Sequence, residues 1–261
     1  MSRIPSAKVA SLFRYPVKGL SPEPLTSVSL EPGQTFPADR RYAIENGPSG
    51  FDAAAPAWLP KSRYLMLMRN ERLAELQSHY DDPSHNLTIH RRGEMAVRAD
   101  LQTPGGRAAI EDFFATNFSS ELKGPPKILS GGGHSFSDVA RKVVSIINLN
   151  SLAVIESMIG LPVHPLRFRA NLYVSGWPAW HEFELMGRAL SIGEVRLNVV
   201  KRITRCAAIN VDPQTAARDL DIPSELMRRM NHADCGVYAE VVAGGSIGVG
   251  DAIATEQPRL I

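Results

Sequence analysis

Residues of alternating polarity fill many short stretches of this chain, and this period of two constrains the fold more than any other feature. Residues 74–80 alternate in this way, and so do residues 87–90 and 95–99. Such alternation is typical of strands with one buried and one solvated face. Arg92-Gly93-Glu94 lies between two of these stretches and predicts a hairpin turn. The first half is therefore predicted to form an antiparallel barrel or rolled sheet.

Three segments predict helices within this mainly β pattern. Residues 104–118 follow Thr103, which is a suitable N-cap, and they begin with a proline. Residues 151–159 end at a glycine and a proline, and residues 224–230 form a short amphipathic segment. In the last helix the inward side chains are predicted to be Leu226, Met227 and Met230. The expected fold class is mixed and mainly β: an N-terminal β-barrel-like domain, then a second β-barrel domain with a few helices.

Two strands of the second half are predicted to carry aligned polar side chains. Alternation over residues 168–174 places Arg169 and Asn171 on one face, although a plain solvent-facing strand explains the same pattern. Beyond the strand at residues 195–199, continued alternation aligns three further side chains opposite Ile203, provided that no bulge breaks the register. These side chains are Arg202, Thr204 and Cys206.

The composition changes at residues 119–135, which we predict to connect two domains. The predicted ranges are 1–122 for the N-terminal domain and 136–256 for the second domain. The connection contains the glycine run 131–133. No Gly-Lys-Ser/Thr follows it, so a mobile loop is favoured over a phosphate-binding loop, and such a loop could cover a site.

The gross composition excludes several classes of protein. Lys and Arg number 29 against 27 for Asp and Glu, so the net charge of +2 provides no global field for nucleic acid or an anionic membrane. No signal-like N-terminus and no run of about 18 to 20 apolar residues occurs, which predicts a cytoplasmic protein without a membrane partner. With two cysteines, a disulfide framework or a four-cysteine metal site is excluded.

Cys206 is the strongest candidate for chemistry. Three cations precede it within five residues: Lys201, Arg202 and Arg205. Nearby positive charge favours the thiolate, which is both a nucleophile and a soft metal ligand. The alternative is an inert buried cysteine, since free cysteine is among the most buried residue types.

Six motifs in order resemble the MOSC proteins, named for the C-terminal domain of molybdenum cofactor sulfurase, together with the β-barrel domain that often precedes it. The nearest characterised group that the sequence resembles is the amidoxime-reducing components. The motifs are Tyr15-Pro16-Val17-Lys18-Gly19, Asp39-Arg40-Arg41-Tyr42, Phe136-Ser137-Asp138, Phe168-Arg169-Ala170-Asn171-Leu172-Tyr173-Val174, Thr204-Arg205-Cys206 with Val211-Asp212-Pro213, and Gly248-Val249-Gly250-Asp251.

The resemblance implies a molybdenum cofactor, a molybdenum ion held by molybdopterin, with Cys206 as the protein ligand of the metal. It also implies that the pterin and its phosphate are bound by the other motif residues. These are Lys18, Arg40, Ser137, Asp138, Arg169, Asn171, Thr204, Arg205 and Tyr238. One departure is that Val139-Ala140 replaces the small polar residues often found after Ser-Asp.

The activity implied is the reduction of N-hydroxylated compounds by removal of oxygen. Since the chain carries no ferredoxin-like cysteine cluster, electrons are expected from a separate ferredoxin or flavoprotein reductase. The general acid is left open between Asp138, His134 and Tyr238. The pyridoxal phosphate domain of cofactor sulfurases has no room here, so pyridoxal phosphate is an association of the family only.

Two other functions remain open at the level of sequence. The chain could carry the cofactor, or shuttle sulfur as a persulfide on Cys206, without redox catalysis of its own. It could also be a binding or structural barrel in which the cysteine has no role. Trp177, Trp180 and His181 then pack in the interior, whereas a functional site would place them at a pocket mouth.

Overall fold

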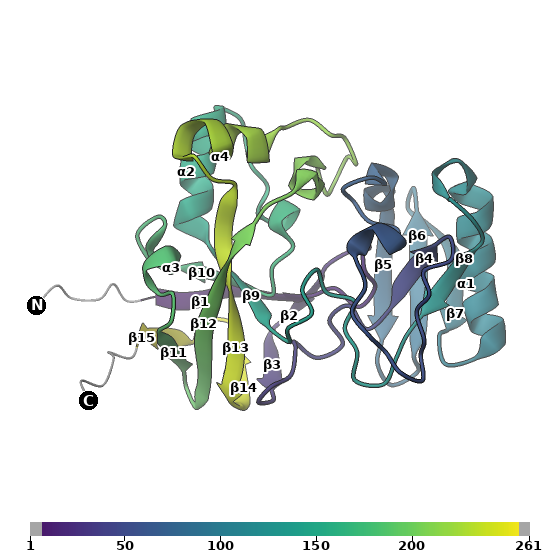
Figure 1. The fold of residues 1–261 in the computed structure, drawn as a ribbon, viewed down its shortest axis with the longest axis horizontal. Helices are drawn as coiled ribbons and strands as arrows, with labels where there is room; N and C mark the ends of the chain where they lie inside the picture. Colours follow the sequence, from purple (N-terminus) through teal and green to yellow (C-terminus); the bar gives the residue numbers. More distant parts are fainter. Residues whose placement is uncertain (1–6, 256–261) are drawn as a thin grey trace, which may run out of the picture.

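The computed structural model describes residues 7–255, which form two lobes side by side (Figure 1). One lobe is a closed barrel flanked by helices, and the other combines small sheets with one long helix. The mixed, mainly β fold class is confirmed. None of the helices in residues 7–255 is both long and apolar enough to span a bilayer.

Seven strands close the barrel in the order β10, β9, β13, β12, β11, β15, β1, and β1 pairs with β10 to complete the ring. All neighbours are antiparallel except β9 and β10. Their bounds are β1 Ala7–Arg14, β9 Val144–Asn148, β10 Leu172–Ser175, β11 Ala189–Ile192, β12 Val195–Thr204, β13 Asp234–Ala243 and β15 Ala252–Thr255. Closure leaves no free edge in the ring. β2 Glu23–Leu25 pairs with β1, and β3 Ser27–Leu30 and β14 Gly245–Gly248 form a separate two-stranded sheet.

The barrel interior is filled by the apolar side chains that the period of two predicts. Leu197 and Val199 of β12 alternate with half-buried polar residues, and Val237, Ala239 and Val241 of β13 are buried beside them. Each fully buried aliphatic side chain contributes about 1.5 to 3 kcal/mol. This core fixes the strand ends that reach the site.

The second lobe packs helix α1, Pro104–Asn117, near two small sheets. One sheet pairs β4 Ala43–Asn46 with β8 Pro126–Leu129, and the other contains β5 Leu76–Asp81, β6 Asn86–Arg91 and β7 Glu94–Asp100. Thr103 caps the helix by accepting a hydrogen bond from the Gly106 amide at 3.0 Å, which confirms the predicted N-cap. The predicted hairpin turn joins β6 to β7 through Arg92 and Gly93, both with positive φ.

The remaining helices lie on the barrel lobe (Figure 1). They are α2 Leu149–Ile159, α3 His181–Glu184 and α4 Ile222–Met230. The predictions for residues 151–159 and 224–230 are confirmed, each two residues short at its start. Leu226 is buried, but Met227 is 52% exposed, so its predicted inward position is wrong. Trp177 is fully buried, as expected for packing.

Two strand predictions near the site are wrong. Residues 165–168 form the 3-10 turn η4 Pro165–Phe168, and Arg169 has a left-handed backbone with φ 52°, so β10 begins only at Leu172. A left-handed residue breaks the alternation on which the shared face of Arg169 and Asn171 was based. Strand β12 has register shifts and ends at Thr204, so Cys206 lies beyond it, just before the 3-10 turn η5 Ala207–Asn210.

Strand pairing links the two halves of the sequence. β1 belongs to the N-terminal half, yet it hydrogen-bonds to β10 and β15 of the barrel. The predicted connection contains β8, a regular strand paired with β4. The predicted domain ranges stay predictions, and their outer ends, residues 1–6 and 256, lie outside the described residues.

Candidate functional site

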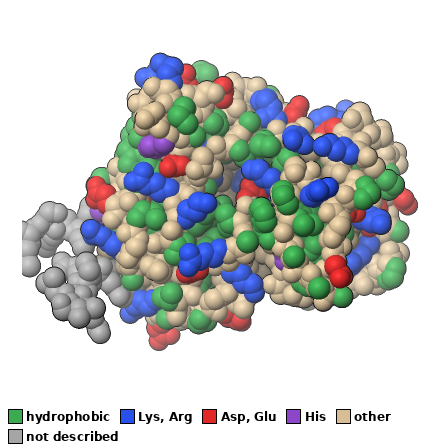
Figure 2. All heavy atoms as spheres, in the orientation of Figure 1, with side chains coloured by type: hydrophobic (Ala, Val, Ile, Leu, Met, Phe, Trp, Pro, Cys, Tyr) green, Lys and Arg blue, Asp and Glu red, His purple; other side chains and the backbone are tan. Residues whose placement is uncertain are grey.

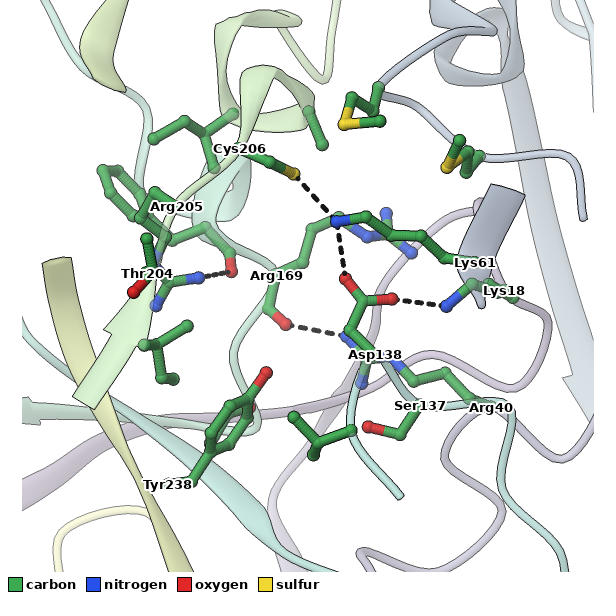
Figure 3. Close-up of a pocket in the computed structure, with 18 of the residues that line it drawn as sticks. Lys18, Arg40, Lys61, Ser137, Asp138, Arg169, Thr204, Arg205, Cys206 and Tyr238 are labelled. Atoms are coloured by element: carbon green, nitrogen blue, oxygen red, sulfur yellow. Dashed lines mark hydrogen bonds and ion pairs between the residues drawn. The ribbon is translucent and has the colours of Figure 1, made fainter. Parts of the chain in front are cut away.

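A cavity of about 290 Å³ lies between the two lobes. Its walls come from the β1–β2 connection, the loop after β3, the η1 turn Lys61–Arg63, the segment before β9 and the end of β12. All ten residues expected at the site line this one cavity, and nine of them are labelled in Figure 3. They are Lys18, Arg40, Ser137, Asp138, Arg169, Asn171, Thr204, Arg205, Cys206 and Tyr238.

Lys18 is buried in the wall of the cavity. A bridge between Val17 and Tyr42 fixes the backbone just before it. Its ammonium donates to the Phe136 carbonyl at 2.8 Å and to Asp138 Oδ1 at 2.5 Å. Burial lowers the pKa of Lys18, and the negative charge of Asp138 only partly opposes this effect. The hydrogen bonds to Phe136 and Asp138 hold the ammonium of Lys18 in place.

Asp138 is shared by two lysines. Its Oδ2 lies 3.3 Å from Lys61 Nζ, while Oδ1 faces Lys18 (Figure 3). Burial raises the pKa of Asp138, but Lys18 and Lys61 outweigh it, so the pKa lies well below its ordinary value. Asp138 is an anion at neutral pH, which rules it out as the general acid.

Lys61 is the residue of this site that sequence reasoning missed. Its ammonium lies 3.2 Å from Cys206 Sγ as well as near Asp138, so it joins the two lobes through the cavity (Figure 3). Burial lowers the pKa of Lys61, but Asp138 and Cys206 raise it by more than burial lowers it. The pKa of Lys61 therefore lies above its ordinary value. Pro60-Lys61-Ser62 carries no periodicity or motif, so only the folded loop brings Lys61 to the sulfur.

Cys206 is a free, half-buried thiol at the cavity wall, whereas Cys235 is fully buried and does not line the cavity. Burial raises the pKa of Cys235 to about 12. Cys235 thus fits the description of an inert buried cysteine. Cys206 is the cysteine whose sulfur a ligand in the cavity can reach.

Arg40 and Arg169 both lie against the ring of Tyr15. Their Cζ atoms are 4.7 and 4.3 Å from the ring centroid, and Arg40 also donates to the Arg169 carbonyl at 3.0 Å. Both arginines have left-handed backbones, with φ 51° and 52°. Such conformations cost of order 1 kcal/mol or more for residues with a Cβ and concentrate at functional sites.

The charges of Arg40 and Arg169 are balanced differently. Arg40 pairs with Asp39, whose charge outweighs the effect of burial and raises the pKa of Arg40. Arg169 donates to the Leu20 carbonyl at 2.8 Å, and no carboxylate among residues 7–255 forms an ion pair with it. Burial lowers the pKa of Arg169 to about 10. Arg169 is thus a half-buried cation that forms no ion pair with a carboxylate of the described residues.

Arg205 is a second such cation. Its guanidinium donates to the carbonyls of Cys235 at 2.7 Å and Phe168 at 2.9 Å, and within the described chain it has no carboxylate partner. Its Nη2 is buried and has no hydrogen-bond partner in this part of the chain. A buried unpaired donor costs about 1 to 3 kcal/mol, more on a charged group. Arg169 and Arg205 together are suited to an anionic ligand.

The other expected residues differ in how free they are to bind. The Asn171 side chain is already hydrogen-bonded to Ser145 and to the Phe13 carbonyl, so it supports the wall. Thr204 donates to Asp234 at 2.7 Å. Burial raises the pKa of Tyr238, so its hydroxyl keeps its proton at neutral pH.

His134 does not line this cavity. It belongs to a second, more open cavity of about 670 Å³ on the other side of Asp39, together with the glycine run 131–133. Its ring packs against Phe51 and Phe136. The predicted loop over the site therefore faces a different hollow, and His134 is removed from the candidates for the general acid.

The site and the fold together define a protein with a closed β barrel and a cysteine in a cationic cavity. The description "MOSC domain" matches residues 131–254, and "MOSC N-terminal beta barrel domain" matches residues 6–124. The chain is a MOSC domain protein with an N-terminal MOSC barrel domain. MOSC domains are associated with cofactor sulfurases and with proteins that bind the molybdenum cofactor.

Three solved structures that match this chain share little sequence with it. The YuaD protein of Bacillus subtilis is 14% identical, with a TM-score of 0.48 over 96% of this chain and 95% of that one. YiiM of Geobacillus stearothermophilus is 15% identical, with a TM-score of 0.36 over 45% of this chain and 55% of that one. YiiM of Escherichia coli is 18% identical, with a TM-score of 0.31 over 44% and 54%. No curated protein matches the chain.

Proposed function

We propose that the cavity between the lobes binds the molybdenum cofactor through Cys206 and that the protein reduces N-hydroxylated compounds. The observation that carries this proposal is the pair of half-buried arginines, Arg169 and Arg205, that have no carboxylate partner in residues 7–255 and lie on the wall that presents Cys206. A ligand that is anionic at one end and offers a soft metal at the other satisfies both features.

The residues present fit this group. The cavity volume of about 290 Å³ is near the lower end, about 300 Å³, for small-molecule pockets. Arg169, which donates only to the Leu20 carbonyl, provides charge-assisted hydrogen bonds to a phosphate or pterin oxygen, worth about 1.5 to 3 kcal/mol each, and Arg205 adds positive charge to the same wall. Cys206 supplies one soft ligand. Since residues 7–255 contain no cluster of three or more His, Cys, Asp or Glu suited to a metal, the remaining ligands would come from the cofactor.

Residues of the chain itself hold a proton and charged groups in position in the cavity. When bound, the cofactor supplies the two-electron chemistry by which an N–OH compound takes up two electrons and two protons and leaves as the amine and water. Tyr238 holds a proton at its hydroxyl oxygen in the cavity. Asp138 keeps the ammonium groups of Lys18 and Lys61 in place by sharing its carboxylate between them. A separate ferredoxin or flavoprotein reductase would provide the electrons.

The test uses protein purified from a host that makes the cofactor and from the same host without cofactor synthesis. We expect molybdenum and fluorescent oxidised pterin only in the first preparation. With reduced viologen as the electron donor, this preparation should reduce benzamidoxime to benzamidine. Absence of both molybdenum and pterin from the first preparation would contradict the proposal.

A sulfur carrier is the second candidate, and one observation favours it: Cys206 is the one cavity thiol in the described chain, and a lysine cation lies beside its sulfur. This arrangement suits a nucleophilic thiolate that takes the outer sulfur of a donor persulfide and releases the donor thiolate. Mass spectrometry of the purified protein distinguishes the two functions. A persulfide on Cys206, transferable to a thiol acceptor, with full cofactor occupancy and no benzamidoxime reduction, would favour the carrier.

A further inference from the structure

We propose that Lys61 is a substrate-binding residue that grips the N–O oxygen of the substrate and favours compounds in which this oxygen carries negative charge, such as N-oxides. The inference rests on the proposed function and assigns a role that no motif of the sequence indicated. It begins with position: Lys61 Nζ lies 3.2 Å from Cys206 Sγ, and it is the one ammonium or guanidinium in the described chain within hydrogen-bond distance of this sulfur.

The loop that carries Lys61 is firmly anchored. The η1 turn ends at Arg63 and is followed by Tyr64, which bridges to Glu45 of β4, and the Leu65 amide donates to the Ile44 carbonyl at 2.9 Å. The base of the side chain is thus fixed, while four methylenes leave the ammonium free to swing by a few Å. The side chain is 30% exposed, so the ammonium lies toward the open side of the cavity.

Two of the other cations that line the cavity are already held by partners. Lys18 is held by Asp138 and the Phe136 carbonyl, and Arg40 is held by Asp39 and the Arg169 carbonyl. Lys61 has three N–H donors and uses two, one toward Cys206 and one toward Asp138. One donor is left, and it belongs to the cation nearest the sulfur.

Metal binding at Cys206 changes the balance of these contacts. A sulfur that shares its charge with a metal attracts the ammonium less strongly than a free thiolate does. A substrate that reacts at a metal on Cys206 must bring its oxygen within a few Å of that sulfur, where Lys61 already lies. A charge-assisted hydrogen bond from Lys61 to that oxygen replaces the contact with Cys206 and is stronger for an anionic oxygen than for a neutral hydroxyl.

The experiment measures ligand binding without turnover. Molybdenum-loaded protein is kept oxidised with no electron donor, and the Kd values of pyridine N-oxide and of pyridine are measured by calorimetry. For Lys61→Met we expect about tenfold weaker binding of pyridine N-oxide, equivalent to about 1.4 kcal/mol. Pyridine binding should be unchanged. Lys61→Arg should restore most of the affinity because it keeps the cation.

Lys201→Met is the matched control, because Lys201 lines the same cavity but forms no hydrogen bond with Cys206. It should weaken N-oxide binding by less than about twofold. Equal losses in Lys61→Met and Lys201→Met, equal losses for pyridine and pyridine N-oxide, or no loss at all would overturn the role of Lys61. A wild-type protein that takes up no molybdenum would overturn the proposed function, and this inference with it. Loaded wild-type protein that reduces N-oxides, with Lys61→Met unchanged, would overturn only the inference.

Discussion

Arg169 and Arg167 offer a direct comparison between a half-buried cation that forms no ion pair with the described carboxylates and a buried cation that forms two. Arg167 is 1% exposed in its side chain and binds Asp212 and Asp219, each at 2.8 Å, whereas Arg169 has only the Leu20 carbonyl and the Tyr15 ring. We predict opposite effects of replacing each with methionine. In the metal-free protein, Arg167→Met should destabilise the fold, and Arg169→Met should not.

The magnitudes follow from the partners. Breaking a buried ion pair by removing one member costs about 3 to 5 kcal/mol, and the lower value applies to Arg167 because Asp219 is 43% exposed. Burial lowers the pKa of Arg169 from 12.5 to about 10, which corresponds to a penalty of up to about 3 kcal/mol for its charge. Loss of its hydrogen bond and ring contact costs about 1 to 2 kcal/mol. The net change for Arg169→Met lies between zero and about 2 kcal/mol of stabilisation.

The assay is urea unfolding of both variants and the wild type, purified from the host without cofactor synthesis. Protein from the cofactor-competent host is then analysed for molybdenum. Arg169→Met should lose about tenfold or more in cofactor affinity, from one lost charge-assisted hydrogen bond. If Arg169→Met lowered the unfolding midpoint as much as Arg167→Met does, Arg169 would be a structural residue and the reasoning would be refuted.

Three further predictions follow from the same contacts. Cys206→Ser should abolish molybdenum binding while the free energy of unfolding changes by less than about 1 kcal/mol, because serine removes the soft ligand and little volume; metal analysis and urea unfolding test this. Cys235→Ser should keep molybdenum but lose about 1 to 3 kcal/mol of stability, because it buries a hydroxyl in an apolar cluster; loss of the metal would mean that Cys235 is the ligand. Burial raises the pKa of Glu182, so its charged form costs stability at neutral pH. The free energy of unfolding of the wild type, relative to Glu182→Gln, should therefore rise as the pH falls from 7 to 4, and a fall would contradict the raised pKa.

The period of two identified several of the strands, among them β6, β12 and β13. It predicted the hairpin at Arg92 and Gly93 and the inward residues of β12 and β13. It could not predict that β1 closes the barrel, because this pairing joins residues 8–12 to residues 172–175 and depends on the whole tertiary fold. Local alternation carries no information about partners so distant in sequence.

The site residues that belong to sequence motifs could be predicted. Residues that only the tertiary fold brings to the site could not. The motif residues do line one cavity, but Arg169 reaches it through a left-handed backbone and Cys206 from a turn, not from one strand face. Lys61 approaches Cys206 across 145 positions of sequence, and its own neighbours carry no signal. The roles of these residues toward the cofactor stay predictions.

Alkylation of the two cysteines by iodoacetamide, read by mass spectrometry, tests most directly whether Cys206 binds the metal. The metal-free protein should be labelled at Cys206, which is half-buried at the cavity wall, and not at the fully buried Cys235. In the molybdenum-loaded protein, Cys206 should be protected in proportion to metal occupancy, and urea should expose both cysteines. Equal labelling of Cys206 in loaded and metal-free protein, at full molybdenum occupancy, would contradict the account.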